Sequence, residues 1–434
     1  LNYLYYMNLA VIGSGGREHA LCYKLRKSKE IKKLFCIPGN AGTNKLAENI
    51  KEDISNFDKI YQIIKEKKID FVVIGPEEPL VNGIVDYLSK KKIKTFGPDK
   101  FASQLEGSKA FMKSLCKKNK IPTADFGIFQ NFDEAITFIK SAKMPIVVKA
   151  DGLAAGKGVS ICNSKEDAKI KVKEIIDGKF KSSNKVVLEE FIEGEELSYF
   201  SVVDEKTFSF FGSAQDHKKV GEMDTGPNTG GMGAYTPANI LTKELEEKIK
   251  KKIIEPTLKA LKEMGHPYKG FLYTGLMIKK NEPYLIEYNI RMGDPECQVL
   301  MMKLETSLAQ IIKAVAENSL ENLKINWNDK SCMTIVLCSK GYPDKYEKNC
   351  EIKNLDKLIG DENTQVFHAG TYEKNKKIYS NGGRVLNITA CEKNITLARD
   401  KCLNHLKIIN WSKGFYRKDI GWRVIKNEDN KRKI

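Results

Sequence analysis

Three short apolar segments near the start of the chain, each followed by a glycine- or proline-containing turn, constrain the fold most strongly. They read LAVIGSGG, LFCIPGN and DFVVIGPE, and stretches with helical periodicity separate them. A strand, a tight turn and a helix repeated at this spacing are typical of a parallel sheet whose strands alternate with helices. Ligands of such sheets bind beyond the carboxyl ends of the strands. The sequence therefore predicts an α/β domain over residues 7–107, with the three turns at one edge of its sheet.

Two further patterns follow along the chain. Residues 108–325 alternate helices with longer strands, among them IVVKA, KVVLEEFI, LSYFSVV and YLIEYNIR, and predict an α+β domain with a small lid at about residues 122–192. Residues 326–426 contain the short strands CMTIVLC, QVFHAGTY and RVLNITA and one helix from Thr396, which indicates a mostly β domain. The polar end KNEDNKRKI predicts a disordered tail over 427–434. We expect a multidomain protein of mixed α/β and α+β class.

The charge of the chain suggests nucleic acid at first sight, because its 434 residues carry a formal net charge of +17. The lysines, however, are spread along amphipathic stretches and do not gather around aromatic residues. We interpret these lysines as solvated faces. A net positive charge also suits small phosphorylated substrates. Apolar runs stay far short of the roughly 20 residues that a membrane-spanning helix needs. The sequence therefore favours neither a nucleic acid nor a membrane as partner.

The cysteines and the first residues of the chain indicate the cellular compartment in which the protein works. Ten cysteines occur without a Cys-x-x-Cys pair, and Cys332 and Cys338 are too far apart for the usual zinc spacing. We interpret all ten as reduced thiols of a cytoplasmic protein. The segment before Met7 lacks a basic region and a small-residue cleavage site, so we expect no signal peptide and take the fold to begin at Met7.

The stretch KADGLAAGKGV, residues 149–159, resembles a phosphate-binding P-loop only superficially. Gly152 and Gly156 enclose three residues where that motif needs four, and Gly158 stands where its hydroxyl should be. What remains is Lys149 at the end of an apolar run and a glycine-rich loop that carries Lys157. Such a loop can place backbone N–H groups on an anion.

A second glycine-rich turn, VIGSGGREHA, joins the first predicted strand to a helix. A dinucleotide-binding turn would need glycine where this chain has Glu18. Gly15 and Gly16 could still present N–H groups to a phosphate at the helix N-terminus. Arg17 supports an anion there, because a cation at a helix start opposes the helix dipole. A tight turn with no ligand remains the alternative.

The stretch YLIEYNIRMGDPE carries the most chemistry. On a strand, Glu287, Asn289 and Arg291 share one face. A carboxylate and a carboxamide suit a hard cation that phosphates already chelate. Arg291 could hold a carboxylate or phosphate beside it. The alternative, a solvated strand face, is opposed by the apolar residues on the other face.

Two remaining stretches suggest a substrate clamp and a nucleotide hinge. AQDHKKVGEMDTGPNTGGMGAYTP places Asp216 and His217 before a loop with several glycines, although His217 alone is more typical of a hydrogen-bonded core residue. KVVLEEFIEGEE ends a buried strand with consecutive acids. A hinge whose backbone pairs with adenine, followed by a carboxylate on the ribose, would explain those acids.

These stretches, in this order, resemble the ATP-grasp superfamily and, within it, the phosphoribosylamine–glycine ligase (glycinamide ribonucleotide synthetase) family. The resemblance runs from Asn8 to about Ile425 and includes GGREHA, PGNAGT, QLEGSKAFMK, KADGLAAGKGV, DTGPNTGGMGAY, RMGDPE and KDIGWR. It implies the second step of de novo purine biosynthesis, in which ATP, glycine and 5-phosphoribosylamine give glycinamide ribonucleotide, ADP and phosphate. It also implies Mg²⁺ or Mn²⁺ as the metal.

The resemblance implies roles for individual residues. Lys109 and Lys149 would contact the nucleotide phosphates, with Lys149 and Arg291 catalytic, and the loop with Gly156, Lys157 and Gly158 would close over the phosphates. The adenine hinge would be Glu189, Glu190, Phe191 and Ile192, with Glu195 or Glu196 on the ribose. Glu287 and Asn289 would bind the metal. Gly15, Gly16, Arg17, Asn40 and Glu77 would face phosphoribosylamine, and Arg291, Asp294, Asp216 and His217 would address glycine and its acyl phosphate.

Two departures and several alternatives accompany this interpretation. Met292 stands where the family usually has Phe or Leu, and Gly275 stands where many ATP-grasp enzymes have an acid, which puts a second metal in doubt. Another ATP-grasp ligase remains an alternative, as does a nucleotide-binding regulator. A carboxylase is disfavoured because we recognise neither a biotin-attachment motif nor a second catalytic domain. We expect a monomer or weak homodimer, with transient contact to the preceding purine-pathway enzyme.

Overall fold

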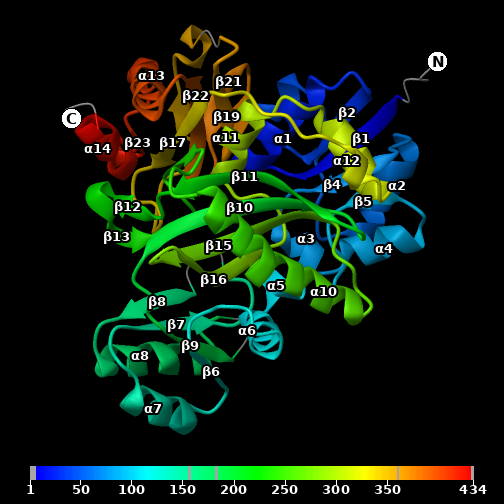
Figure 1. Ribbon diagram of the computed structural model, residues 1–434. Helices are drawn as coiled ribbons and strands as arrows, with labels where there is room; N and C mark the ends of the chain where they lie inside the picture. The colour runs from blue at the N-terminus through cyan, green and yellow to red at the C-terminus, as the bar shows by residue number, and fades with distance from the viewer. Residues whose placement is uncertain (1–5, 155–157, 181–183, 359–360, 432–434) are drawn as a thin grey trace.

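The computed structural model describes residues 6–154, 158–180, 184–358 and 361–431. Its first domain contains a parallel sheet of five strands in the order β3-β2-β1-β4-β5 (Figure 1). Gly13 pairs with Pro38, and Ile12 pairs with Ile74, so the first three turns lie at one edge of this sheet, as predicted. The elements are β1 (Met7–Gly13), α1 (Gly16–Arg26), β2 (Ile31–Pro38), η1 (Thr43–Lys45), β3 (Glu48–Asn49), α2 (Phe57–Glu66), β4 (Phe71–Ile74), α3 (Glu77–Val81), α4 (Ile84–Lys90) and β5 (Lys94–Phe96).

Alternate residues of these strands enter two different hydrophobic cores. Leu9 and Val11 of β1 pack into the core that includes α1, whereas Ala10 and Ile12 pack into the core that includes α2 and α4. Both sets are fully buried. A parallel sheet covered on both faces needs such continuous apolar runs. The strands of this domain could therefore be recognised from the sequence.

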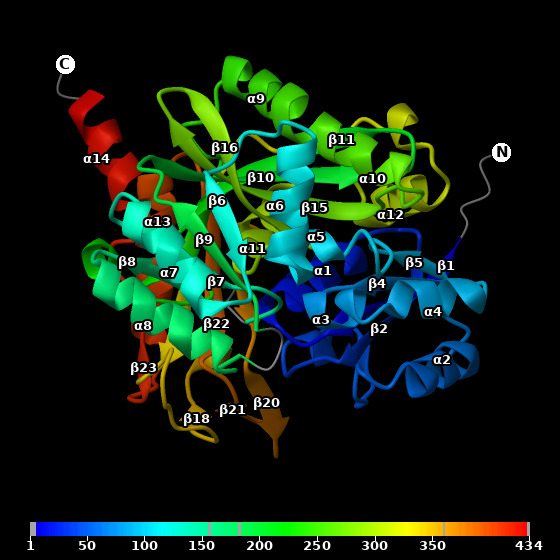
Figure 2. The same cartoon turned by 90° about the horizontal axis from the view of Figure 1, so that it is seen from below.

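The lid is a four-stranded antiparallel sheet in the order β6-β9-β7-β8, with α7 and α8 on its outer face (Figures 1 and 2). Val148 and Leu188 pack under these helices. Because side chains alternate along a strand, Lys149 and Glu189 point to the opposite face. The helices α5 (Gln104–Gly107) and α6 (Lys109–Lys118) lead into this unit. Its elements are β6 (Phe126–Phe129), α7 (Phe132–Ser141), β7 (Ile146–Ala150), β8 (Val159–Cys162), α8 (Lys165–Ile176) and β9 (Val186–Glu190).

One large sheet extends through the second half of the chain, in the order β16-β15-β10-β11-β14-β17-β22-β19 with β23 beside β17. The short strand β14 pairs with both β11 and β17. The sheet therefore continues across the domain boundary that we predict near residue 325. Its strands are β10 (Glu195–Val203), β11 (Phe208–Asp216), β14 (Gly233–Thr236), β15 (Gly270–Lys279), β16 (Glu282–Asn289), β17 (Ser331–Ser339), β19 (Thr364–His368), β22 (Arg384–Glu392) and β23 (Gly414–Phe415).

The remaining elements cover this sheet or extend from it. A small hairpin pairs β12 (Lys219–Gly221) with β13 (Thr225–Asn228), and a second small sheet contains β18 (Glu351–Ile352), β21 (Lys377–Ser380) and β20 (Thr371–Lys374). The helices are η2 (Glu222–Asp224), α9 (Lys243–Ile249), the π-helix η3 (Lys250–Ile254), α10 (Glu255–Glu263), α11 (Glu296–Lys303), α12 (Leu308–Ala316), η4 (Leu320–Asn322), η5 (Leu355–Lys357), α13 (Ile395–Ile408) and α14 (Trp422–Lys431).

Helix α14 corrects one prediction. We expected residues 427–434 to be a disordered tail, but the helix continues to Lys431, and residues 432–434 lie outside the described part of the chain. Within that part, no helix combines the length and the apolar character needed to cross a membrane.

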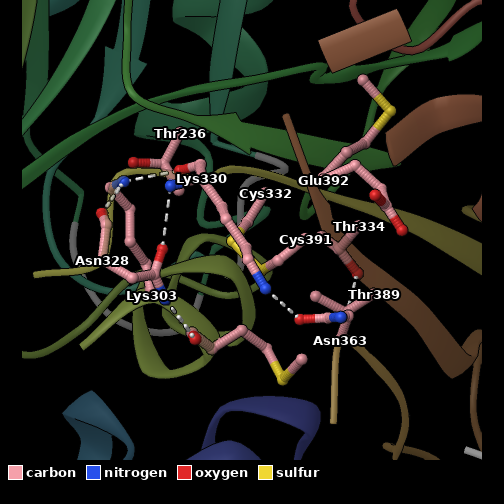
Figure 3. Close-up of a disulfide and its surroundings, with 12 residues drawn as sticks. Thr236, Lys303, Asn328, Lys330, Cys332, Thr334, Asn363, Thr389, Cys391 and Glu392 are labelled. Carbon is pink, nitrogen blue, oxygen red and sulfur yellow. Dashed lines mark hydrogen bonds between the residues drawn. A yellow bond between two sulfur atoms is a disulfide. The ribbon is translucent and has the colours of Figure 1, made fainter. Parts of the chain in front are cut away.

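A disulfide corrects another prediction. We interpreted all ten cysteines as reduced, but Cys332 of β17 is bonded to Cys391 of β22 (Figure 3). The two residues are separated by 59 positions in sequence and become direct neighbours because the antiparallel register places one opposite the other. A hydrogen bond from Thr389 to Thr334 joins the same strands (2.7 Å). The other eight cysteines have free thiols.

A buried histidine contact joins the first domain to the carboxy-terminal strands. Nδ1 of His19, in α1, accepts a hydrogen bond from the backbone N–H of His368 at the end of β19 (2.7 Å). Both side chains are buried. Burial, with the nearby Lys45, lowers the pKa of His368 to about 3 and also holds the pKa of His19 well below its ordinary value. The interface therefore requires neutral imidazoles.

We predict that acid weakens this interface. Below pH 6.5, the ordinary pKa of histidine, the unfolded chain binds protons that the folded protein excludes, so stability falls as pH falls. His368, whose pKa falls to about 3, should contribute a loss of about 2 kcal/mol by pH 5, and His19 shifts stability in the same direction. Urea unfolding at pH 7.5 and pH 5 should show a smaller acid-induced loss for His368→Asn than for the wild type. His405→Asn, on the partly exposed α13, is the control. Equal acid sensitivity of His368→Asn and wild type would contradict the assignment.

Candidate functional site

The end of β16 collects charged side chains from several elements. Glu287 lies there, and Lys149 of β7 in the lid donates to the backbone oxygen of the preceding residue, Ile286 (3.4 Å). Burial alone would raise the pKa of Glu287, yet the surrounding cations outweigh it and hold that pKa below its ordinary value. These cations are Lys218, Lys149, Lys109 and Arg291. The carboxylate is therefore ionised in a site rich in positive charge.

The strand beside Glu287 leaves space for it. Gly275 of β15 is its register partner, and a Cβ at that glycine would lie 3.0 Å from Cγ of Glu287 and 3.1 Å from the ring of Tyr273. A larger residue at 275 would crowd the carboxylate. The glycine that departs from many ATP-grasp sequences therefore fits the packing here. Asn289 follows two residues after Glu287, at the last position of β16.

Glu189 lies between two lysines. It is 2% exposed, and its two carboxylate oxygens form ion pairs of 2.8 Å with Lys149 and Lys113. Burial raises the pKa of Glu189, but the two lysines more than offset this and hold it below its ordinary value. Its backbone belongs to the centre of the lid sheet, opposite Phe126 and Val147. The side chain of Glu189 is thus directed at the lysines, while Glu190, Phe191 and Ile192 continue toward β10.

The glycine-rich loop is described in part. Lys109 donates to the backbone oxygen of Gly152 (3.0 Å), which ties the start of α6 to the loop. A Cβ at Gly158 would lie 2.7 Å from Cβ of Ala154 and 3.3 Å from that of Ala150. Gly158 therefore permits a close approach of the two ends of the loop. Gly156 and Lys157 lie outside the described residues.

A second group of charges lies where β10 and β11 meet. Glu196 pairs with Lys218 (2.9 Å), and Glu195 accepts from Gln215 (2.8 Å). Burial and the carboxylates around it raise the pKa of Asp216 to about 8, although Lys218 opposes the shift. Glu296, at the start of α11, accepts from Ser198 (3.2 Å), and burial raises its pKa as well. The charge of Glu287, the predicted metal-binding carboxylate, also contributes to raising the pKa of Asp216.

Arg291 joins this region to the first domain. Its guanidinium pairs with Glu77 of α3 (3.1 Å) and Glu106 of α5 (2.7 Å). The positive charge of Arg291 lowers the pKa of Glu77 to about 2. Glu106 is more deeply buried, and desolvation raises its pKa to about 7 against the effect of Arg291. Arg291 and Arg17 both donate to the backbone oxygen of Met292 (3.3 Å each).

The glycine turn before α1 already has internal partners. The N–H of Gly15 donates to Glu18 (2.6 Å), and that of Arg17 lies 3.4 Å from a carboxylate oxygen of Asp294. The guanidinium of Arg17 pairs with Glu18 (2.5 Å). Glu18 thus compensates the cation at the helix start, for which we had invoked a bound anion.

Residues from other parts of the chain also contact the turns at this edge of the first sheet. Asn40 donates to the backbone oxygens of Ser14 and His368 (2.8 Å each). A Cβ at Gly16 would lie 2.5 Å from the side-chain amides of both Gln298 and Asn387. The turn is therefore enclosed by residues from three parts of the chain.

His217 does not join these clusters. Its Nε2 accepts from the backbone N–H of Gly421 (3.1 Å), and the side chain is buried. Burial and the neighbouring Arg417 lower its pKa to about 4, so the ring is neutral. This is the core role that we had considered for a lone histidine, and it leaves Asp216 as the member of the pair that faces the other charged residues.

Sequence reasoning missed four residues that the structure brings to the site. Lys113 is fully buried, and the side chain of Glu106 is 9% exposed. Both occur in QLEGSKAFMK, a stretch quoted only for its resemblance. Glu296 follows Asp294 within RMGDPE. Arg384, at the start of β22, donates to the backbone oxygens of Gly230 (2.6 Å) and Asp294 (2.5 Å). The signal for the first two was a charge at a buried helical position.

Family models of phosphoribosylglycinamide synthetase match nearly the whole chain. The N domain matches residues 7–106, the ATP-grasp (A) domain residues 107–297, and the C domain residues 332–423. The phosphoribosylamine–glycine ligase of Brucella melitensis is 46% identical over 423 residues, which cover 97% of this chain and 99% of that protein. That of Haemophilus influenzae is 43% identical over 427 residues, covering 97% and 99%.

Solved structures agree with these matches. The phosphoribosylamine–glycine ligase of Thermotoga maritima superposes with a TM-score of 0.82 at 33% identity, covering 95% of this chain and 99% of that one. The biotin carboxylase domain of the Hydrogenobacter thermophilus 2-oxoglutarate carboxylase has a TM-score of 0.72 at 18% identity, covering 94% and 92%, and shares the fold. By its sequence and by its fold, this chain belongs to the phosphoribosylglycinamide synthetase family of ATP-grasp proteins.

Proposed function

We propose that this chain joins glycine to 5-phosphoribosylamine at the expense of ATP, giving glycinamide ribonucleotide, ADP and phosphate. One observation carries the proposal most directly. Glu287 lies among the lysines of the lid and α6, and Arg291, four residues later, pairs with Glu77 of the first domain. The ATP site and the site of the second substrate would then meet at the end of one strand.

The nucleotide would occupy the space between the lid and β16. Lys109 and Lys149 would hold its phosphates, and the loop around Gly158, with Gly156 and Lys157, would cover them. Glu190, Phe191 and Ile192 would face adenine, and Glu196 or Glu195 the ribose. Because the side chain of Glu189 pairs with Lys149, we assign Glu189 to the support of that lysine.

The residues at β16 fit a hard divalent cation. Glu287 is ionised, and Asn289, two residues later on the same strand, offers a carboxamide oxygen. The protein would therefore supply two donors and the nucleotide the others. A bound Mg²⁺ or Mn²⁺ would screen the charge between the phosphates and the incoming carboxylate. The choice between the two metals stays a proposal.

The proposed reaction requires two anions, the carboxylate of glycine and the γ-phosphate of ATP, to come together at this site. The carboxylate of glycine resists attack by an amine until one of its oxygens becomes a leaving group. Transfer of the γ-phosphoryl group to that oxygen gives glycyl phosphate and ADP. The amine of phosphoribosylamine then attacks the carbonyl carbon, phosphate leaves, and the amine loses a proton. Lysines 109 and 149 would stabilise the transfer by positioning and charge.

The other predicted residues would hold the acceptors. We assign Arg291, Asp294 and Asp216 to glycine and its acyl phosphate, and Gly15, Gly16, Arg17, Asn40 and Glu77 to the neighbourhood of phosphoribosylamine. The pairing of Arg291 with Glu77 and the contact of Asp294 with the turn support this placement. The packing of His217 favours a structural role, so we assign it none in binding.

Compartment and assembly stay predictions. We place the reaction in the cytoplasm and expect a monomer or weak homodimer that contacts the preceding purine-pathway enzyme transiently. A different ATP-grasp carboxylate–amine ligase is the competing function.

The direct test is ADP formation with ATP, Mg²⁺, glycine and phosphoribosylamine. We expect ADP to require both glycine and the amine, and glycinamide ribonucleotide to appear in equal amount. If alanine supported ADP formation as well as glycine does, the proposed substrate would be wrong.

We predict that Glu287→Gln lowers kcat by a factor on the order of 10²–10³, as expected for removing one electrostatic stabiliser of a transition state. Its unfolding midpoint should stay close to that of the wild type, because the change conserves shape. Glu282→Gln is the matched control on the same strand, since Glu282 pairs with surface lysines 248 and 252. Equal kcat values for Glu287→Gln and wild type at saturating Mg²⁺ would contradict the metal assignment.

The loop is tested by Gly158→Val. The added side chain would collide with Ala154 and Ala150 and keep the ends of the loop apart. An open lid admits water, which hydrolyses glycyl phosphate. We therefore expect more ADP than glycinamide ribonucleotide, measured together in one assay. Ile161→Val, at an exposed position of β8, should remain coupled. Full coupling in Gly158→Val would mean that the loop does not exclude water.

A further inference from the structure

Lys113 is a fully buried lysine that the proposed function leaves without a role. It lies on α6, its side chain is 0% exposed, and its ammonium group contacts Glu189 (2.8 Å) and the hydroxyl of Thr123 (2.6 Å). A buried ammonium group is costly to desolvate, and an apolar side chain of similar size often packs at least as well. Packing alone therefore does not explain a lysine at this position.

The contacts of Glu189 suggest the reason. One oxygen pairs with Lys113 and the other with Lys149, so two positive charges share one negative charge. The group of three retains a net charge of +1. If Lys113 were neutral, Glu189 would face Lys149 alone, and the pair would carry no net charge. A neutral pair would attract the phosphates of a nucleotide much less.

The same network ties the lid to the large sheet. The hydroxyl of Thr123, which Lys113 contacts, donates to the backbone oxygen of Leu285 in β16 (2.6 Å). Lys149 donates to the backbone oxygen of the next residue, Ile286 (3.4 Å). Lys113 thus lies where α6, the lid strands and β16 come together. A change in its contacts would alter both the charge and the position of Lys149.

We propose that Lys113 is a positioning residue for ATP: it holds Glu189 between two lysines, so that Lys149 keeps a net positive charge directed at the nucleotide phosphates. This inference rests on the proposed ATP site. It predicts an effect on ligands that carry a triphosphate and little effect on ligands that do not reach Lys149.

The test compares the binding of two probes by calorimetry in the full-length protein with Mg²⁺, namely β,γ-imido-ATP and AMP. Lys113→Met should weaken the binding of β,γ-imido-ATP by about tenfold or more, the change that 1.4 kcal/mol produces, and should leave AMP nearly unchanged. Lys117→Met is the control, one turn along the same helix at an exposed position. A purely structural role of Lys113 would weaken both probes alike.

A charge-matched double variant separates the inference from misfolding. Lys113→Met combined with Glu189→Gln removes both partners of a buried ion pair and restores the net charge of +1 on Lys149, so we expect it to recover most of the affinity for β,γ-imido-ATP. The double variant can be tested in this way even if Lys113→Met alone does not fold. Failure of the double variant to bind better than Lys113→Met, or unchanged binding in Lys113→Met, would overturn the inference. Absence of binding by the wild type would instead refute the proposed ATP site.

Discussion

The ion pairs of Arg291 with Glu77 and Glu106 organise the site, because they fix the end of β16 against the first domain. Holding three largely buried ionisable groups together, with side chains 9–29% exposed, is costly unless each is paired and hydrogen-bonded. Here Glu106 also accepts from the backbone N–H of Ile290 (2.8 Å), and Arg291 also donates to Met292. Glu287 therefore lies on a strand whose end is fixed by contacts with Glu77 and Glu106. A small shift of the first domain relative to this strand would alter both proposed substrate sites.

Local patterns were enough to predict the parts of the fold that depend on neighbouring residues. Strands buried on both faces produced the apolar runs of the first domain, and strand alternation placed Glu287 and Asn289 on one face. The parallel arrangement then placed the turns near Gly15, Asn40 and Glu77 at one edge. Each inference needed only the periodicity of a strand and the geometry of one sheet. The resemblance to a family added the order of the motifs and the reaction.

Long-range pairing could not be predicted in the same way. Cys332 and Cys391 face each other only because of the register between β17 and β22. The continuation of the large sheet past the expected domain boundary depends on β14, a strand of four residues within a glycine-rich stretch. Lys113 and Glu189 belong to different elements, and nothing near either residue in sequence indicates the other. These features arise from tertiary contacts, which a local pattern does not encode.

The charges of the proposed site show how a basic protein can bind a polyanion selectively. Three of its cations already have a carboxylate partner: Lys149 has Glu189, Lys218 has Glu196 and Arg291 has Glu106. A nucleotide must therefore match the arrangement of these cations in order to compete with internal carboxylates, whereas the many surface lysines offer charge without a fixed geometry. Fixed pairs also hold each cation in place before a ligand arrives, so little reorganisation is required when phosphoryl transfer begins. The overall charge of +17 thus bears on how anions approach the protein, while in the proposed site the internal carboxylates would determine which anion fits.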